Sequence, residues 1–207
     1  MGKNVKKYSP QFVLLLCGFF YASYGPLTRI VGNDFGPITQ ILIRTIFRIL
    51  IIGILLLFIK GSKKVARKDI PWLIISGMAG AFTNILYVHA IQNLSMGTTM
   101  FLFYGAGTVI SFIIGKFFFN EKLNQNKLFS LILSIIGLFV LFFNDLSFSN
   151  LKFLFFAGLA GLCYGSYSSF SKKVSSKYSL SQIILSYALI ETVVYLLLLT
   201  FTTESSS

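Results

Sequence analysis

The stretch YSPQFVLLLCGFFYASYGPLT, residues 8–28, decides the fold class because none of its 21 residues carries a charge. Residues 70–83 and 98–115 are equally free of charged side chains. An α-helix needs roughly 20 apolar residues to cross the hydrocarbon core of a bilayer. Across all 207 residues, 55% are hydrophobic and 12% are charged, against about 25% charged in a soluble domain. The sequence therefore predicts an all-α, polytopic membrane helix bundle.

Turn-forming and charged residues divide the chain into spans. GNDFGP at 32–37 supplies a turn and a proline suited to the first turn of a helix, and residues 60–71 form a charged loop. The same punctuation recurs as short polar turns after residues 119 and 143. It predicts seven spans at residues 11–31, 37–59, 70–92, 97–119, 127–144, 151–171 and 180–201.

Basic residues gather in alternate loops, which predicts the direction of the chain across the membrane. Loops on the cytoplasmic side of a membrane carry an excess of lysine and arginine. We therefore expect a cytoplasmic N-terminus, residue 207 on the outer side, and a cell-membrane location. The net charge of +12 then reflects topology rather than binding to nucleic acid. The basic positions are Lys3, Lys6, Lys7, Lys60, Lys63, Lys64, Arg67, Lys68, Lys116, Lys122, Lys127, Lys172, Lys173 and Lys177.

Sequence features for metals, disulfides and lipid anchors are weak. The two cysteines, Cys17 and Cys163, fall inside apolar spans, where a free cysteine behaves as a small hydrophobic residue. The N-terminal MGKNVK has Lys6 where a myristoylation signal needs serine or threonine. The first apolar run passes through Ala22 and Ser23 without a convincing cleavage site, so we do not expect a cleaved signal peptide. We expect neither a metal nor a cofactor.

Two segments of the chain repeat each other at a spacing of 143 residues. FFYASYGPLTRIV at 19–31 returns as LCYGSYSSFSKKV at 162–174. The predicted spans that carry them run in opposite directions, as in the inverted repeats of secondary transporters. Chance similarity among abundant residues is the alternative. The matched positions are Gly18 with Gly161, Tyr21 with Tyr164, Ser23 with Ser166, Tyr24 with Tyr167, and Val31 with Val174.

The same spacing separates two charged residues near the centres of their spans, Arg48 and Glu191. A charge at the bilayer centre costs about 2.5–3.5 kcal/mol on the insertion scale, so each needs a partner or a wet cavity. Arg44 lies one helical turn from Arg48, on the same face. The interpretation as a charge-handling or coupling site competes with that of a structural ion pair.

Polar and small residues mark further candidate positions. In the third span, Asn84 and Tyr87 share one arc with Thr83, which suits the wall of a polar cavity, whereas His89 points elsewhere. His89 is a candidate for proton coupling or, alternatively, hydrogen-bonded scaffolding. Tyr104 begins YGAGT, whose glycines indicate either close helix packing or a cavity. The repeated tyrosines and serines either line a cavity or belong to interfacial belts; these are Tyr21, Ser23, Tyr24, Tyr164, Ser166 and Tyr167.

Residues 90–141, AIQNLSMGTTMFLFYGAGTVISFIIGKFFFNEKLNQNKLFSLILSIIGLFVL, resemble EamA-type permeases of the drug/metabolite transporter superfamily. Ala90, Gly97, Glu121, Leu123 and Gly137 fill that family's motif places, and Arg44 is similar to its second-helix arginine. Gly107 stands where the family often has a proline. We do not expect Glu121 to couple transport, because it lies in a predicted turn beside Lys122 and is suited to capping or local pairing.

The resemblance implies a fold of five plus five inverted helices. Residues 1–144 then form the first five-helix repeat and residues 151–207 the start of a second, inverted repeat. We therefore expect the chain to be truncated, unless it departs from the family in its completeness.

The leading functional hypothesis is a secondary transporter that exports small polar metabolites or amino acids by alternating access. Its expected partners are a small-molecule substrate, protons as a candidate coupling ion, and the lipid bilayer. The alternative is a complete seven-helix protein that does not transport, such as a receptor, immunity factor or scaffold. An enzyme is not expected, because the sequence shows neither an acidic pair nor a His/Cys/Asp cluster and no phosphate-binding loop.

Overall fold

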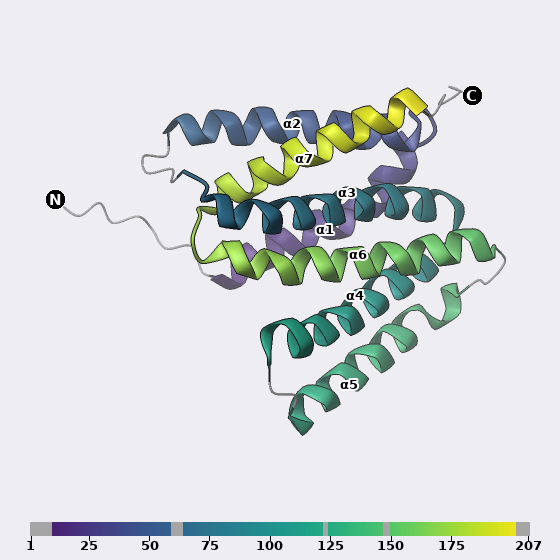
Figure 1. Cartoon of the computed structure of the whole chain (residues 1–207). Coiled ribbons are helices and arrows are strands. Elements are labelled where there is room, and N and C mark those ends of the chain that lie inside the picture. The colour runs from purple at the N-terminus through teal and green to yellow at the C-terminus, as the bar shows by residue number, and fades with distance from the viewer. Residues whose placement is uncertain (1–9, 59–63, 122–123, 147–149, 202–207) are drawn as a thin grey trace.

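The structure, a computed structural model, describes residues 10–58, 64–121, 124–146 and 150–201. Within these ranges the chain forms seven long α-helices and two 3-10 turns (Figure 1). The sequence predictions that concern Lys3, Lys6, Lys7, Lys60, Lys63, Lys122, Leu123 and residue 207 lie outside these ranges. The elements are α1 (Pro10–Val31), α2 (Pro37–Phe58), η1 (Arg67–Asp69), α3 (Ile70–Asn93), α4 (Met96–Phe119), α5 (Gln125–Phe142), η2 (Phe143–Asp145), α6 (Leu151–Ser175) and α7 (Leu180–Phe201).

All seven helices are long and apolar enough to cross a membrane, which confirms the predicted spans and the all-α class. The main differences are at helix ends. α6 continues to Ser175, past the predicted end at residue 171, and α5 begins at Gln125 rather than at residue 127. Lys172 and Lys173 lie in the last turn of α6, so the apolar run ends before the helix does.

Local chemistry explains where several helices begin and end. The hydroxyl of Ser95 accepts a hydrogen bond from the backbone N–H of Thr98 at 3.2 Å and caps the start of α4. Asn120 ends α4 in the left-handed conformation, with φ of 50°, which asparagine tolerates better than most residues. The side-chain oxygen Oδ1 of Asn124 caps α5 by accepting from the backbone N–H of Lys127 at 2.9 Å.

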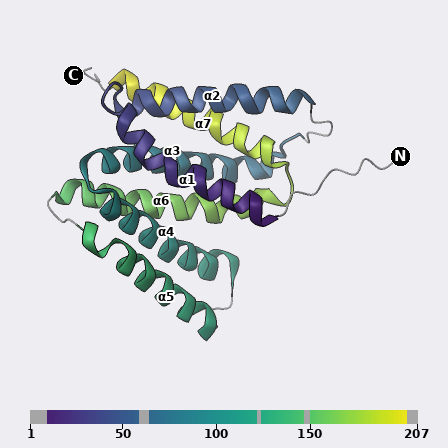
Figure 2. The ribbon, with the colours of Figure 1, turned by 180° about the vertical axis from the view of Figure 1, so that it is seen from behind.

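The helices form a bundle with α2 and α7 at one edge and α5 at the other, in both views (Figures 1 and 2). The most extensive packing joins α6 to α3 and α4, and α7 to α2 and α3. α1 crosses obliquely over α3 on the face seen in Figure 2. α5 packs chiefly against α4 and has no buried residue. The middle of the molecule is therefore built by α3 and α6.

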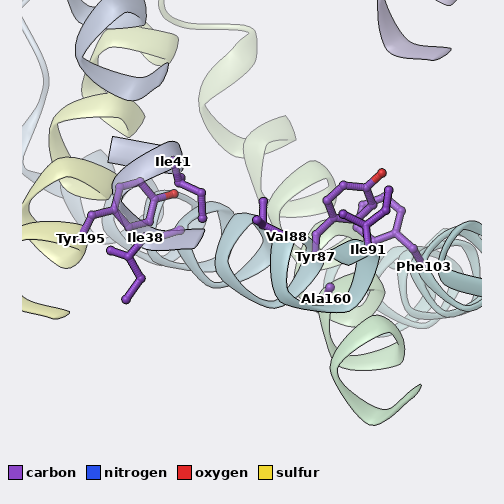
Figure 3. Packing of buried hydrophobic residues seen from close by; sticks show 9 residues of the cluster. Ile38, Ile41, Tyr87, Val88, Ile91, Phe103, Ala160 and Tyr195 are labelled. Carbon is purple, nitrogen blue, oxygen red and sulfur yellow. The ribbon is translucent and has the colours of Figure 1, made fainter. Parts of the chain in front are cut away.

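The main cluster of buried apolar residues follows α3 through the bundle. Figure 3 shows Tyr195 of α7 beside Ile38 and Ile41 of α2 at one part of this cluster. Further along α3, Tyr87 and Ile91 gather with Phe103 of α4. Tyr87 and Tyr195 take part in this core although they carry hydroxyl groups. Polar atoms are therefore present within the buried apolar cluster.

Candidate functional site: a central cavity between six helices

A cavity of about 550 Å³ lies in the middle of the bundle, and every helix except α5 contributes to its lining. This volume falls in the range of small-molecule sites. The lining is largely aromatic and aliphatic, with one acid, one arginine and an amide among it. The lining residues are Phe20, Tyr21, Tyr24, Arg48, Ile52, Gly80, Thr83, Asn84, Tyr87, Met100, Phe103, Tyr104, Tyr164, Tyr167, Ile184 and Glu191.

Aromatic rings from four helices form one continuous wall of the cavity. The ring centroid of Tyr24 lies 5.8 Å from that of Tyr87, and Tyr87 lies 5.0 Å from Phe103. Phe103 in turn lies 5.0 Å from Tyr164 and 5.1 Å from Tyr104. Aromatic pairs at such separations stabilise each other beyond the area that they bury. The wall is therefore a packed surface of aromatic rings, four of which belong to tyrosines and carry a hydroxyl group.

The cavity contains an ion pair between Arg48 of α2 and Glu191 of α7. The Nη1 atom of Arg48 donates to Oε2 of Glu191 at 2.8 Å. Gly80 of α3 makes room for the carboxylate, since a Cβ atom there would lie 2.9 Å from Oε1 of Glu191. The pair neutralises two charges that would each be costly in the interior of a membrane.

A hydrogen bond between two helices holds the one amide in the cavity wall. The Nδ2 atom of Asn84 donates to the hydroxyl of Tyr195 at 3.1 Å. Tyr195 is fully buried and lies one turn beyond Glu191 on α7. α3 and α7 are thus connected beside the ion pair, and the bond fixes the orientation of the Asn84 amide toward the cavity.

Glycines bring α4 and α6 close enough for their tyrosines to face the same cavity. A Cβ atom at Gly161 would lie 2.3 Å from the carbonyl oxygen of Phe103, and one at Gly165 would lie 2.3 Å from that of Gly107. Gly161 and Gly165 are four residues apart on α6, and Gly107 faces them from α4. This is the small-residue packing that membrane helices use for close approach.

Where the basic loops lie, two carboxylates join the ends of α3, α4, α5 and α6 and the connection between α6 and α7; we call this the basic end. Asp69, at the start of α3, accepts from Nζ of Lys177 at 2.5 Å and from the hydroxyl of Tyr178 at 2.8 Å. Glu121, after α4, accepts from Lys127 at 3.3 Å and from Lys172 at 3.2 Å. Hydrogen bonds from Lys172 and Lys127 lower the pKa of Glu121 below its ordinary value.

Comparison with known proteins identifies the family. The model of the EamA-like transporter family matches residues 9–143, well over half of the chain. The chain belongs to the EamA-like transporter family. It is accordingly a multi-pass membrane protein of a transporter family, as the resemblance of residues 90–141 predicted. No curated protein and no solved structure matches the chain.

In this EamA-like chain, most of the candidate residues meet at the cavity. The third-span arc of Thr83, Asn84 and Tyr87 lies in the lining, and both charges of the 143-residue pair do too. The tyrosines Tyr21, Tyr24, Tyr104, Tyr164 and Tyr167 also line it. Three pairs of positions that are 143 residues apart therefore meet at one cavity: Tyr21 with Tyr164, Tyr24 with Tyr167, and Arg48 with Glu191.

Four candidate residues do not line the cavity. Ser23 and Ser166 donate to carbonyl oxygens of their own helices, at 2.9 Å and 2.8 Å, as membrane serines commonly do. His89 packs with its ring centroid 6.2 Å from that of Phe156. The repeated phrase in the sequence did not separate the two serines from the tyrosines beside them that line the cavity.

Arg44 lies behind the aromatic wall rather than in the lining. Its guanidinium carbon is 5.0 Å from the Tyr24 ring centroid. It donates to the Thr28 hydroxyl at 3.0 Å and to the Gln40 side-chain oxygen at 2.7 Å. Arg44 therefore joins α1 to α2 and supports Tyr24 from outside the cavity.

The apolar part of the lining and Tyr195 were not among the candidates. Phe20, Met100 and Phe103 line the cavity, but nothing in their spacing distinguishes them among the 23 phenylalanines and other apolar residues of the chain. Tyr195 had a usable signal, because it follows Glu191 by four residues and so shares its helix face. The position four residues from a charged residue inside a span is therefore the signal that points to Tyr195.

Proposed function

We propose that this chain acts as a secondary transporter that exports small polar metabolites or amino acids by alternating access of two inverted repeats. The observation that carries the proposal is the meeting of repeat-related positions at one cavity. Arg48 with Glu191, Tyr21 with Tyr164, and Tyr24 with Tyr167 are each separated by 143 residues, and all six line it. In inverted-repeat transporters the substrate site lies at the interface of the repeats, near the midplane.

The chemistry of the lining favours a substrate with both charged and apolar parts. In the proposal, the guanidinium of Arg48 binds a carboxylate of the substrate, and the carboxylate of Glu191 binds an ammonium group of the substrate. Two ion pairs between protein and substrate thus replace the ion pair between Arg48 and Glu191. The aromatic wall receives the apolar side chain. Without substrate, Glu191 pairs with Arg48; while the pair is open during the exchange, Glu191 is also the group suited to carry a proton.

The ion pairs at the basic end support the alternating-access part of the proposal. Lys177 with Asp69 and Lys172 with Glu121 each join α6 or the α6–α7 connection to the part of the chain before residue 144. Contacts of this kind close one end of the bundle. The exposed Glu121 pair breaks and re-forms at modest cost as one repeat moves against the other, whereas the Asp69 carboxylate is buried and its pair is the more costly one to separate.

The test is counterflow in proteoliposomes, which requires no knowledge of the energy source. Each batch of vesicles is loaded with a high concentration of one unlabelled amino acid and diluted into buffer that contains a trace of the same amino acid in labelled form. Counterflow is measured as accumulation of the label inside the vesicles above its outside concentration. We expect uptake for at least one zwitterionic compound, with a loss of tenfold or more in Glu191→Gln. Ser166→Ala, whose side chain bonds to its own helix, is the matched control and keeps wild-type flux.

Binding without flux would overturn the proposal. If a compound raises the thermal midpoint of the folded wild-type protein, and Glu191→Gln removes that shift, while no compound gives counterflow, then the cavity binds but does not transport. The chain would then be a receptor or scaffold of the EamA-like family rather than a permease.

A further inference from the structure

At the basic end, three helices bring two lysines and three aromatic rings together. Lys173, in the last turn of α6, places its Nζ atom 5.0 Å from the ring centroid of Phe119 in α4 and 5.6 Å from that of Trp72 in α3. Lys172 places its Nζ atom 5.6 Å from Phe119. We call Trp72, Phe119, Phe170, Lys172 and Lys173 the lysine cradle.

The rings of the lysine cradle hold each other in place. The Phe170 centroid lies 5.8 Å from that of Trp72, and it lies 5.4 Å from the neighbouring Phe118. Cation–π contact orients an ammonium group but leaves its N–H groups free to donate elsewhere. Lys173 is accordingly half-buried and positioned, unlike Lys64, Arg67 and Lys68, which are exposed on the same end of the bundle.

The lysine cradle carries more positive charge than its surroundings neutralise. Glu121 is shared between Lys172 and Lys127, and no carboxylate pairs with Lys173 among residues 10–58, 64–121, 124–146 and 150–201. Three lysines against one glutamate leave a surplus of two positive charges. A phosphate group can accept from both Lys172 and Lys173 at once.

The position of the lysine cradle selects the source of that phosphate. Trp72, Phe119 and Lys173 lie at the ends of three membrane-spanning helices, where lipid headgroups are found. Phe117 and Phe118, next to Phe119 in sequence, are 71% and 57% exposed and so present apolar surface to acyl chains. We propose that the lysine cradle is a binding site for one anionic phospholipid, with the headgroup phosphate on Lys172 and Lys173 and an acyl chain along Phe118.

The usual bias of lysine toward one side of a membrane does not account for this arrangement. That bias concerns the number of basic residues in a loop and requires no particular position or contacts of their side chains. Here one ammonium is held over rings from two other helices, in the boundary zone, beside exposed apolar rings. Basic pockets between membrane helices are known to bind acidic headgroups.

Trp72 is the only tryptophan of the 207-residue chain and therefore reports directly on this site. The protein is reconstituted in phosphatidylcholine vesicles, and a fixed mole fraction of lipid is replaced by brominated phosphatidylglycerol or by brominated phosphatidylcholine. Bromine on an acyl chain quenches tryptophan on contact. We expect stronger quenching by the anionic lipid, with a selectivity of about fivefold per lysine. Lys172→Gln with Lys173→Gln should bring the two quenching curves together, while Lys173→Arg keeps them apart.

Two control variants separate a built site from general surface charge. Lys64→Gln with Lys68→Gln removes the same two charges from the same end, and Lys152→Gln removes a lysine that also lies over rings, of Phe153 and Phe156, near the start of α6. Both should keep the wild-type selectivity, with all variants first shown to be monodisperse. The proposal fails if Lys64→Gln with Lys68→Gln lowers the selectivity as much as Lys172→Gln with Lys173→Gln does, or if the wild type shows none. It also fails if millimolar inorganic phosphate changes Trp72 emission in detergent as strongly as the anionic lipid does, because the site would then bind a free anion.

Discussion

The side chains of Arg48 and Glu191 are exposed to very different extents, 36% and 4% respectively. A carboxylate so deeply buried depends on its partner, whereas a guanidinium that reaches an open cavity keeps other contacts. Loss of one member of a buried pair costs about 3–5 kcal/mol, and replacement of both by neutral residues is close to neutral. At the scale of single residues, Glu191 therefore depends more on its partner than Arg48 does.

The first prediction follows from that inequality. Arg48→Met leaves Glu191 unpaired and should lower folded yield and thermal midpoint more than Glu191→Gln does. The double change, Arg48→Met with Glu191→Gln, should recover most of the stability that Arg48→Met loses. Fluorescence-detected size exclusion after a heating series in detergent measures all three. If the double variant were less stable than Arg48→Met by the full cost of Glu191→Gln, the two effects would add and the 2.8 Å contact would contribute nothing to the stability of the fold.

Individual residues also show where sequence reasoning succeeded and where it could not. Charges inside apolar spans, such as Arg48 and Glu191, are costly enough that they had to meet a partner or a cavity. Tyr21 and Ser23, two residues apart in the same repeated phrase, separate in the structure because only the tyrosine reaches the cavity. Phe103 lines the cavity only through the packing of α4 against α6, which no local pattern encodes.

At the scale of elements, the approach of α4 and α6 depends on two glycines whose missing side chains would meet backbone atoms. Gly161→Ala and Gly165→Ala should each force the helices apart and cost about 1–3 kcal/mol, since a backbone carbonyl cannot move aside as a flexible side chain can. Gly158→Ala, on the same helix, has nothing within 4 Å of the new Cβ atom and serves as the control. Thermal midpoints in one detergent compare the three. Equal midpoints for Gly161→Ala and Gly158→Ala would mean that α4 and α6 are not in close contact at Gly161.

A second prediction at this scale concerns Glu121, which joins α6 to the α4–α5 turn. The lysines lower its pKa in the folded protein, so the ion pairs stabilise the fold above the ordinary glutamate value of 4.5 and lose this effect as pH falls through the lowered value. The thermal midpoint of the wild type should exceed that of Glu121→Gln by a small, constant amount from pH 7 to 5 and converge with it on further acidification. A gap that widened toward acid would contradict the sign of the pKa shift.

At the scale of the whole molecule, the number and order of helices followed from hydropathy because apolar length is imposed by the bilayer itself. The arrangement of the helices around the cavity did not. α5 is as apolar as its neighbours, yet it lies at the edge of the bundle without a buried residue. Side chains that face lipid and side chains that face protein are equally apolar in a membrane, so hydrophobicity does not distinguish α5 from a central helix such as α3.

The direction of the chain across the membrane is the remaining whole-molecule prediction, and cysteine labelling tests it. Cys17→Ser with Cys163→Ser gives a cysteine-free background, in which Asp34→Cys and Ser176→Cys each place one exposed thiol near opposite ends of the bundle. The lysine distribution predicts that a membrane-impermeant maleimide labels Asp34→Cys in intact cells and labels Ser176→Cys only after the membrane is opened. The reverse pattern would put the basic end, with the Asp69 and Glu121 ion pairs, on the outer side. The unequal charge of the loops would then not set the topology of this chain.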